Sequence, residues 1–94
     1  MKFMLTFTWK EGAKNQEEGI ARFAAGLGTP PKGAKLLNRW TRADFFGGYD
    51  LIETEDPKTL AEFAIRWSDI MNIEIYPVLD DEPLLEVLKK GGKL

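Results

Sequence analysis

The stretch FMLTFTW, residues 3–9, places an apolar side chain at every second position, with β-forming residues in between. Period-two patterning of this kind is typical of a β-strand. Helix-like and strand-like patterns alternate after it, so the chain reads strand, helix, strand, strand, helix, strand. The predicted strands are 1–9, 34–42, 46–54 and 71–78, and the predicted helices between them are 15–27 and 56–70.

Residues at the ends of these segments support the order. Asn15, with Glu18 three positions later, is typical of the capping pair that begins a helix. Asp56 followed by Pro57 predicts the start of the second helix, with aspartate as the cap and proline at the first helical position. The glycine pair 47–48 predicts a bulge or a close approach of two backbones in the third strand.

Two interleaved β-α-β units of this kind form a four-stranded antiparallel sheet with the spatial order 4-1-3-2. Both crossover helices then lie on the same face of the sheet. The predicted fold class is therefore α+β, with a ferredoxin-like βαββαβ arrangement followed by an amphipathic tail helix over 83–90. Residues 1–94 are predicted to form one domain, because a chain of 94 residues leaves no room for a second.

Apolar side chains project from both faces of the predicted sheet. Along the last strand, Ile73 and Ile75 point opposite to Tyr76 and Val78. An antiparallel sheet with one face in water normally shows cleaner polar alternation. We therefore expect the uncovered face to carry more apolar area than a soluble monomer exposes. A homodimer in which two such faces meet is the expected cover, because one patch complements itself about a twofold axis. The tail helix is the alternative cover.

The chain contains neither cysteine nor histidine. Disulfides, thiol nucleophiles, histidine-dependent catalytic triads and metal sites built on thiolate or imidazole ligands are therefore excluded. No cofactor and no metal site are expected. The acidic run 80–82 before the tail helix is interpreted as favourable charge at a helix N-terminus, with metal binding as the alternative.

The charge balance also limits the expected partners. There are 13 basic and 15 acidic residues, which give a formal net charge of −2 without a basic stripe, so nucleic acid is not expected. The apolar runs are far shorter than a membrane span, and the first residues do not follow the pattern of a secretory signal. We expect a cytoplasmic protein that does not associate with membranes.

Short motifs occur along this order of elements: FMLTFTW at 3–9, NRW at 38–40, GYDLIETEDP at 48–57 and PVLD at 77–80. Together they resemble a family of short bacterial and archaeal domains of unknown function in the dimeric α/β-barrel superfamily, close to the GYD-type domains. The similarity covers nearly the whole chain. It implies a ferredoxin-like fold and a homodimer whose sheets pack face to face.

The resemblance implies no single activity, because fold does not determine function. The superfamily includes cofactor-free monooxygenases, haem-degrading enzymes, stress-responsive barrels and ligand-sensing domains. In the family, the position after the tryptophan of the second strand often holds histidine, whereas this chain has Thr41. This departure puts a proton-transfer role at that position in doubt.

The second strand carries the most suggestive candidate site. Asn38, Trp40 and Arg42 are spaced by two, which places them on one face of one strand. An amide, an indole and a guanidinium can line a pocket for an aromatic or anionic small molecule, by stacking and charge-assisted hydrogen bonds. The alternative is that Trp40 packs in the core or in an interface, while Asn38 and Arg42 form hydrogen bonds with backbone groups at the sheet edge or with a carboxylate. Arg39 is predicted to lie on the opposite face, in solvent.

Two further aromatic residues complete the candidate ligand-binding set. Trp9 ends a central strand and is predicted to wall a cavity between sheet and helices, and Tyr49 is placed beside it as a second wall. Aromatic side chains are also enriched at protein interfaces, which is the alternative interpretation. The function expected from the sequence is a small homodimeric module that binds a small ligand or a protein partner. The alternative is a cofactor-independent monooxygenase-like enzyme acting on a small aromatic compound.

Overall fold

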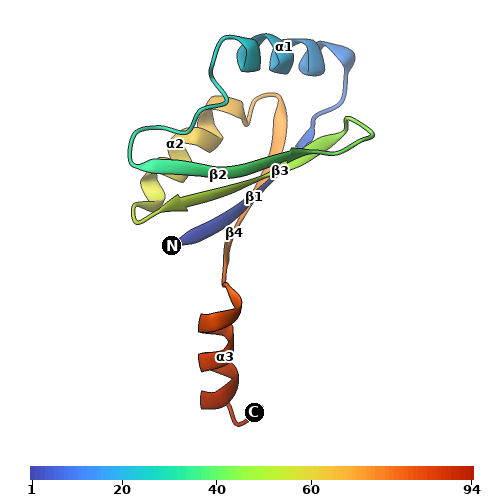
Figure 1. The fold of residues 1–94 in the computed structure, drawn as a ribbon. Coiled ribbons are helices and arrows are strands. Elements are labelled where there is room, and N and C mark those ends of the chain that lie inside the picture. The colour runs from blue at the N-terminus through green and yellow to red at the C-terminus, as the bar shows by residue number, and fades with distance from the viewer.

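The computed structural model describes residues 1–94 as four strands and three helices (Figure 1). In chain order these are β1 (Lys2–Trp9), α1 (Ala13–Ala24), β2 (Ala34–Thr41), β3 (Gly47–Thr54), α2 (Pro57–Trp67), β4 (Met71–Val78) and α3 (Asp81–Lys90). The predicted α+β fold class with an antiparallel sheet is confirmed, and the arrangement is consistent with a ferredoxin-like fold.

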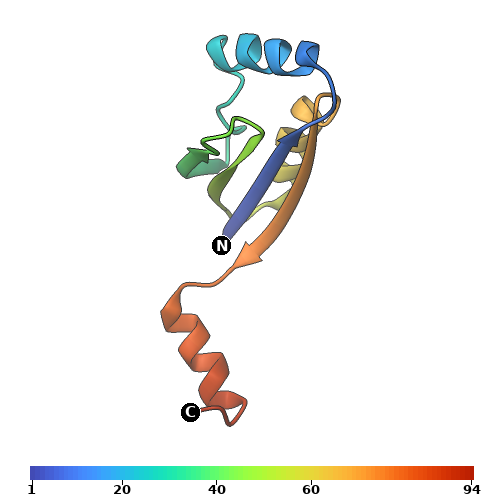
Figure 2. The same ribbon diagram turned by 90° about the vertical axis from the view of Figure 1, so that its right-hand side faces the viewer.

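The four strands form one antiparallel sheet in the order β2-β3-β1-β4. Counted from the β4 edge, this order reads 4-1-3-2. One face of the sheet is covered by α2, and α1 lies on the same side beyond the C-terminal end of β1 (Figures 1 and 2). No helix covers the other face, which we call the open face.

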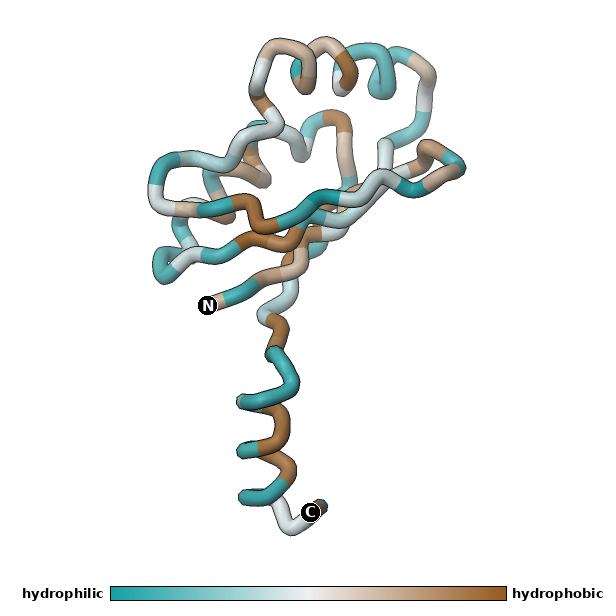
Figure 3. The backbone as a smooth tube through the Cα atoms, in the orientation of Figure 1, coloured by the Kyte–Doolittle hydropathy of each residue, from teal (hydrophilic) through white to brown (hydrophobic).

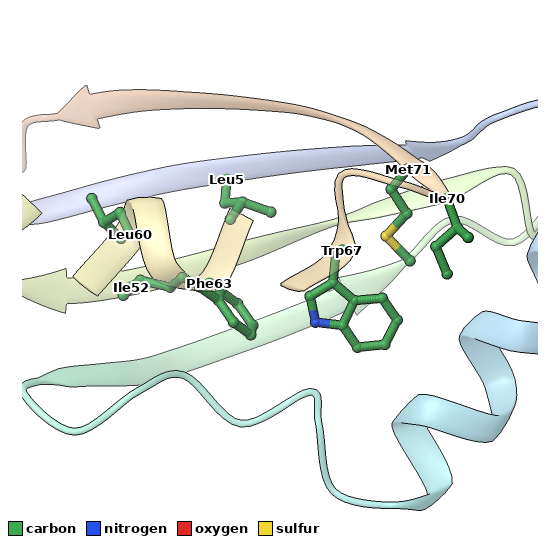
Figure 4. Packing of buried hydrophobic residues seen from close by; sticks show 7 residues of the cluster. All are labelled: Leu5, Ile52, Leu60, Phe63, Trp67, Ile70 and Met71. Carbon is green, nitrogen blue, oxygen red and sulfur yellow. The ribbon is translucent and has the colours of Figure 1, made fainter. Parts of the chain in front are cut away.

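The core lies between the sheet and α2. Leu5 of β1 and Ile52 of β3 contribute from the sheet, and Ile52 is fully buried. Figure 4 shows how the buried side chains of α2 and of the turn into β4 pack against them. The complete cluster is Leu5, Ile52, Leu60, Phe63, Trp67, Ile70 and Met71. Helix α1 adds no side chain to it, because its one buried residue is a glycine.

Helix α2 begins as predicted. The side chain of Asp56 accepts a hydrogen bond from the backbone N–H of Lys58, at 3.0 Å, and Pro57 occupies the first helical position. The predicted end at residue 70 is too late, because α2 ends at Trp67 and a turn leads to the first residue of β4.

The capping pair predicted for α1 does not form. The helix begins at Ala13, because Gly12 adopts a φ of 110° that turns the chain into the helix two residues early. Asn15 therefore lies inside the first turn, where its amide group donates to the carbonyls of the preceding loop. Glu18 accepts from the guanidinium of Arg22 instead of capping the backbone. The helix ends at Ala24, three residues before the predicted end at Leu27.

The third helix, α3, leads away from the end of β4 and does not fold over the open face (Figures 1 and 2). It starts at Asp81, two residues before the predicted start, and has no buried residue. The tail helix is therefore not the cover of the open face in this chain. None of the three helices has the length and apolar character needed to cross a bilayer.

Candidate functional site

A cavity of about 210 Å³ lies between α1, α2 and the helix-covered face of the sheet. Its walls are mainly aromatic and aliphatic side chains that come from β1, β4, the hairpin between β2 and β3, α1 and α2. The apolar lining residues include Leu5, Phe7, Trp9, Ile20, Phe23, Phe45, Phe63, Trp67, Met71 and Ile73. The space exists because α1 stands away from the sheet and leaves Ile20 and Phe23 more than half exposed.

One ion pair supplies the charged groups of this cavity. The Nε of Arg39 donates to one carboxylate oxygen of Asp50 at 2.6 Å, and its Nη2 donates to the other at 3.0 Å. The same Nη2 also donates to the backbone carbonyl of Gly28 at 2.6 Å. The Asp50 side chain is only 3% exposed, and the Arg39 side chain is 22% exposed. Bidentate pairing of this kind fixes the plane of the guanidinium.

The second terminal nitrogen of Arg39, Nη1, makes no hydrogen bond in the structure. Its guanidinium lies 5.8 Å from the ring centre of Phe23, which holds the arginine from the α1 side. The cavity therefore combines apolar walls with one oriented guanidinium whose Nη1 has no acceptor. This is the usual composition of a small-molecule site.

Arg39 faces this cavity because β2 contains a bulge. The pairing of β2 with β3 shifts between Leu36 and Asn38, so Leu37 is an extra residue in the strand. An extra residue reverses the alternation of every side chain after it. Without the bulge, Trp40 would share the face of Leu36 and Arg39 would point to the open face. The prediction that Arg39 lies in solvent is therefore wrong.

Trp9 closes one end of the cavity. Its indole Nε1 donates to the backbone carbonyl of Phe45 in the β2–β3 hairpin, at 2.9 Å, and the two rings lie 6.1 Å apart. Phe45 adopts a φ of 64°, in the left-handed region that favours glycine. On the other side the indole packs so closely against α1 that a Cβ on Gly19 would lie 2.1 Å from it. Only glycine fits there.

Helix α1 is fixed to the rest of the domain by Arg22. Its guanidinium donates to both carboxylate oxygens of Asp69, at 2.9 and 2.7 Å, and to the backbone carbonyl of Arg66. Hydrogen bonds from Arg22 lower the pKa of Asp69 to about 2. The hydrogen bonds to Asp69 and Glu18 raise the pKa of Arg22. Since Arg22 also lies 5.8 Å from the ring centre of Trp67, this residue sets the distance between α1 and the core.

The model of a family described as a domain of unknown function (DUF3303) matches residues 1–92. The chain belongs to this family. A search of the curated proteins and a search of the solved structures gave no match. The prediction that the chain belongs to an uncharacterised domain family is thus confirmed, and the match covers nearly the whole chain.

The predicted site residues lie on different faces of the sheet in the structure. Trp9 lines the cavity. Asn38, Trp40 and Tyr49 lie on the open face, where Trp40 and Tyr49 are paired across β2 and β3. The predicted alternation of Asn38 and Trp40 against Arg39 is correct, although Arg39 is the member that reaches the cavity.

Arg42 lies just past the end of β2, in the hairpin, where it forms an ion pair with Asp44. The backbone N–H of Phe46 and the Arg42 guanidinium lower the pKa of Asp44. Arg42 is not among the lining residues of the cavity, whereas the neighbouring Thr41 is. The structure therefore brings Trp40 and Tyr49 together but separates both of them from Trp9.

Sequence reasoning missed the polar pair of the cavity. Asp50 pairs with Leu5 and Arg39 in the register and lies on the helix-covered face, whereas Glu53 lies on the open face. The Leu36-Leu37 pair interrupts the alternation of β2 and is the one signal that would have indicated the bulge. No cluster of three carboxylate, histidine or cysteine side chains is placed to hold a metal ion.

Proposed function

We propose that this domain is a small-molecule binding module whose ligand occupies the cavity between α1, α2 and the sheet. The observation that carries the proposal is that Arg39 lines this largely apolar cavity and that its Nη1 makes no hydrogen bond. Aromatic walls provide stacking and dispersion contacts, and a fixed donor orients one polar group of the ligand. A ligand that satisfies both has an aromatic ring with a hydrogen-bond acceptor attached.

The volume limits the ligand to about one ring. A dry cavity of about 150 Å³ already accepts benzene, and this cavity measures about 210 Å³. A benzene ring with one small substituent therefore fits, whereas a fused two-ring compound requires α1 to move outwards. The exposed Ile20 and Phe23 of α1 line the side on which such movement would occur.

The charge of the site favours a neutral acceptor over an anion. Asp50 already compensates the charge of Arg39, and its carboxylate is almost fully buried beside the guanidinium. A second carboxylate at Nη1 would gain a hydrogen bond but would be repelled by Asp50 through a medium of low dielectric constant. A carbonyl or ether oxygen gains the hydrogen bond without this repulsion. The proposed ligand class is therefore a neutral single-ring aromatic carbonyl compound.

We further propose that the domain belongs to the dimeric α/β-barrel superfamily, near the GYD-type domains, and acts as a homodimer whose open faces meet. Supporting this, Trp40, Tyr49 and Tyr76 on the open face are 46%, 42% and 48% exposed. With Met4 and Leu51 between them in the register they form one surface, which we call the open-face patch. Tryptophan and tyrosine are the residues most enriched at interfaces.

The ligand proposal is tested by comparing acetophenone with ethylbenzene, which has the same ring and a similar size but no acceptor. We expect acetophenone to bind about tenfold more tightly, because a hydrogen bond to a charged donor contributes roughly 1.5–3 kcal/mol. The measurement is the chemical-shift change of indole N–H signals in NMR titrations. Benzoate, as the charged comparison, is expected to bind less tightly than acetophenone.

The matched variants are Arg39→Lys and Arg42→Lys. Lysine at position 39 keeps a positive charge beside Asp50 but lacks the fork that presents Nη1. It should abolish the preference for acetophenone over ethylbenzene. The same change at Arg42, which lies outside the cavity, should leave that preference unchanged. Equal binding of the two compounds to the unmodified protein, or no binding of either, would contradict the proposal.

The aromatic walls of the cavity also favour a second candidate, a cofactor-independent monooxygenase-like enzyme acting on a small aromatic compound. An electron-rich dihydroxyarene held among these walls would react directly with dioxygen, so the test is oxygen uptake with a panel of such compounds. Uptake that is lost when Phe7 or Trp67 is replaced by alanine, in variants that still fold by circular dichroism, supports the enzyme. No uptake above the rate without protein contradicts it.

A further inference from the structure

We propose that the hydroxyl of Thr41 is a second polar contact in the cavity, and that the ligand is a 4-hydroxyphenyl ketone or aldehyde. The carbonyl oxygen of such a compound accepts from Arg39, and its phenolic hydroxyl pairs with Thr41 at the opposite end of the ring. This inference rests on the proposed small-molecule site and narrows its ligand class. It is carried by the polar groups of the cavity that have no partner.

Most polar side-chain groups of the cavity already have partners. The indole N–H groups of Trp9 and Trp67 donate to backbone carbonyls at 2.9 and 3.2 Å. Both carboxylate oxygens of Asp50 accept from Arg39. Thr41 also lines the cavity, and its hydroxyl makes no hydrogen bond in the structure. This hydroxyl and the Nη1 of Arg39 are therefore the polar side-chain groups that remain for a ligand.

Thr41 follows Arg39 by two residues in β2 and lies on the same face of the sheet. The register pairs Arg39 with Asp50 and Thr41 with Gly48, and the pairing is regular beyond the bulge. The Cα atoms of the two residues are therefore about 7 Å apart along the strand. Figure 3 shows that β2 has a hydrophobic segment at its centre, followed by a more hydrophilic one towards the hairpin. The two polar groups thus come from successive rows of the sheet.

The ring of Phe7 provides an apolar surface beside Thr41. Phe7 and Thr41 are both paired with Gly48, from β1 and from β2. A Cβ on Gly48 would lie 2.6 Å from the Phe7 ring, so this ring extends over β3, the strand that separates β1 from β2. An aromatic ligand can therefore stack on Phe7 while its substituents reach the two polar groups.

The two polar groups differ in what they can bind. A guanidinium only donates, so its partner is an acceptor such as a carbonyl oxygen. A threonine hydroxyl both donates and accepts, so it can pair with a ligand group that donates. Asp50, the other acceptor of the cavity, has a side chain that is 3% exposed and is already engaged by Arg39 through both oxygens. A donor on the ligand is therefore expected at Thr41.

The spacing of the two groups determines where the ligand carries them. Opposite carbons of a benzene ring hold two substituents as far apart as one ring allows, whereas neighbouring carbons hold them side by side. Thr41 is exposed, so a hydroxyl that pairs with it lies at the mouth of the cavity. The enclosed part of the cavity, of about 210 Å³ in total, is then left to the ring and the carbonyl group.

The test compares 4-hydroxyacetophenone with 4-methylacetophenone, in the unmodified protein and in Thr41→Val. Valine keeps the branched shape of threonine and favours a strand, so the fold should be retained. NMR titrations of the indole N–H signals give a ratio of the two dissociation constants for each protein, in which common effects cancel. We expect Thr41→Val to weaken binding of the hydroxyl compound about fivefold relative to the methyl compound, as for the loss of one neutral hydrogen bond.

Two further variants and one isomer serve as controls. Thr41→Ser keeps a hydroxyl and should retain the ratio of the unmodified protein. Thr6→Val is the matched control, because Thr6 pairs with Tyr49 and lies on the open face; it should also leave the ratio unchanged. In 3-hydroxyacetophenone the hydroxyl lies one carbon closer to the carbonyl group. Thr41→Val should leave the binding of this isomer unchanged.

The outcomes separate the contact at Thr41 from the binding site as a whole. A ratio that is the same in Thr41→Val and in the unmodified protein overturns the contact, and so does an equal change in Thr6→Val. An equal loss for the 3-hydroxy and 4-hydroxy isomers overturns the assigned ligand class. The proposed function is judged by the preference for acetophenone over ethylbenzene, which should persist in Thr41→Val. If the unmodified protein lacks that preference, both proposals are contradicted.

Discussion

In the ion pair between Arg39 and Asp50, the carboxylate is almost fully buried. The acidic partners of the other ion pairs are between 45% and 87% exposed, whereas Asp50 is 3% exposed. Surface pairs contribute little, because water screens them and two side chains must be ordered. Removing one partner of a buried pair leaves an uncompensated charge, which is a much larger effect.

We expect Arg39→Met to lower the free energy of unfolding by about 3–5 kcal/mol, since Asp50 loses both charge-assisted hydrogen bonds. Urea unfolding followed by tryptophan fluorescence measures this change. The double variant with Asp50→Leu should recover most of the loss, because an apolar pair of similar volume needs no compensation. A single variant as stable as the unmodified protein would show that the pair is solvated.

Gly19 determines how closely α1 approaches the sheet. Alanine normally stabilises a helix interior by up to about 1 kcal/mol relative to glycine. Here its Cβ would lie 2.1 Å from the indole of Trp9, and that ring is held by its hydrogen bond to Phe45. We expect the overlap to dominate and Gly19→Ala to destabilise the domain by about 1–3 kcal/mol.

Thermal unfolding of Gly19→Ala measures this effect, and the double variant with Trp9→Phe is its control. The smaller ring frees the space that the new methyl group needs, so adding Gly19→Ala to Trp9→Phe should cost less than adding it to the unmodified chain. An increase in stability for Gly19→Ala alone would contradict the close packing of α1 on Trp9.

At the scale of elements, α1 is held mainly by polar contacts. Arg22 joins it to Asp69 and to the backbone carbonyl of Arg66, while Ile20 and Phe23 stay largely exposed. Elements with few buried apolar contacts open more easily than the core. Helix α1 is therefore expected to be the wall of the cavity that moves when a ligand enters.

This attachment should depend on pH. The pKa of Asp69 is lowered to about 2 from 3.8, so its stabilising contribution is present above pH 3.8 and is lost as the pH falls towards 2. We expect Asp69→Asn to be less stable than the unmodified protein at pH 5 and to approach it at pH 2. Urea midpoints at pH 5, 3 and 2 measure the difference. Glu62→Gln, an exposed carboxylate without an ion-pair partner, is the control and should show no such convergence.

The order of the elements was predictable because periodicity and turn residues act locally. The Asp56-Pro57 start and all residues of β4 were predicted as observed. The bulge at Leu37 was not, because it depends on how β2 pairs with β3 rather than on β2 alone. That single extra residue exchanges the faces of Arg39 and Trp40, so the polar group of the cavity was missed although the strand itself was predicted.

At the scale of the whole molecule, both faces of the sheet carry apolar side chains. The helix-covered face holds the core and the cavity, and the open face holds the patch of Trp40, Tyr49 and Tyr76. The prediction of apolar residues on both faces is confirmed, and the homodimer that it implies stays a prediction. The structure adds that α3 projects from the sheet instead of covering it.

The central claim is that the ligand site lies inside the domain, at Arg39, and not on the aromatic open face. The most direct measurement is an isotope-filtered NOE experiment between unlabelled acetophenone and the labelled protein. We expect contacts from the ring protons to Phe7 and Trp67 in the cavity, and from the methyl group to the neighbourhood of Arg39. Contacts to Trp40, Tyr49 or Tyr76 instead would place the compound on the open face and contradict the account.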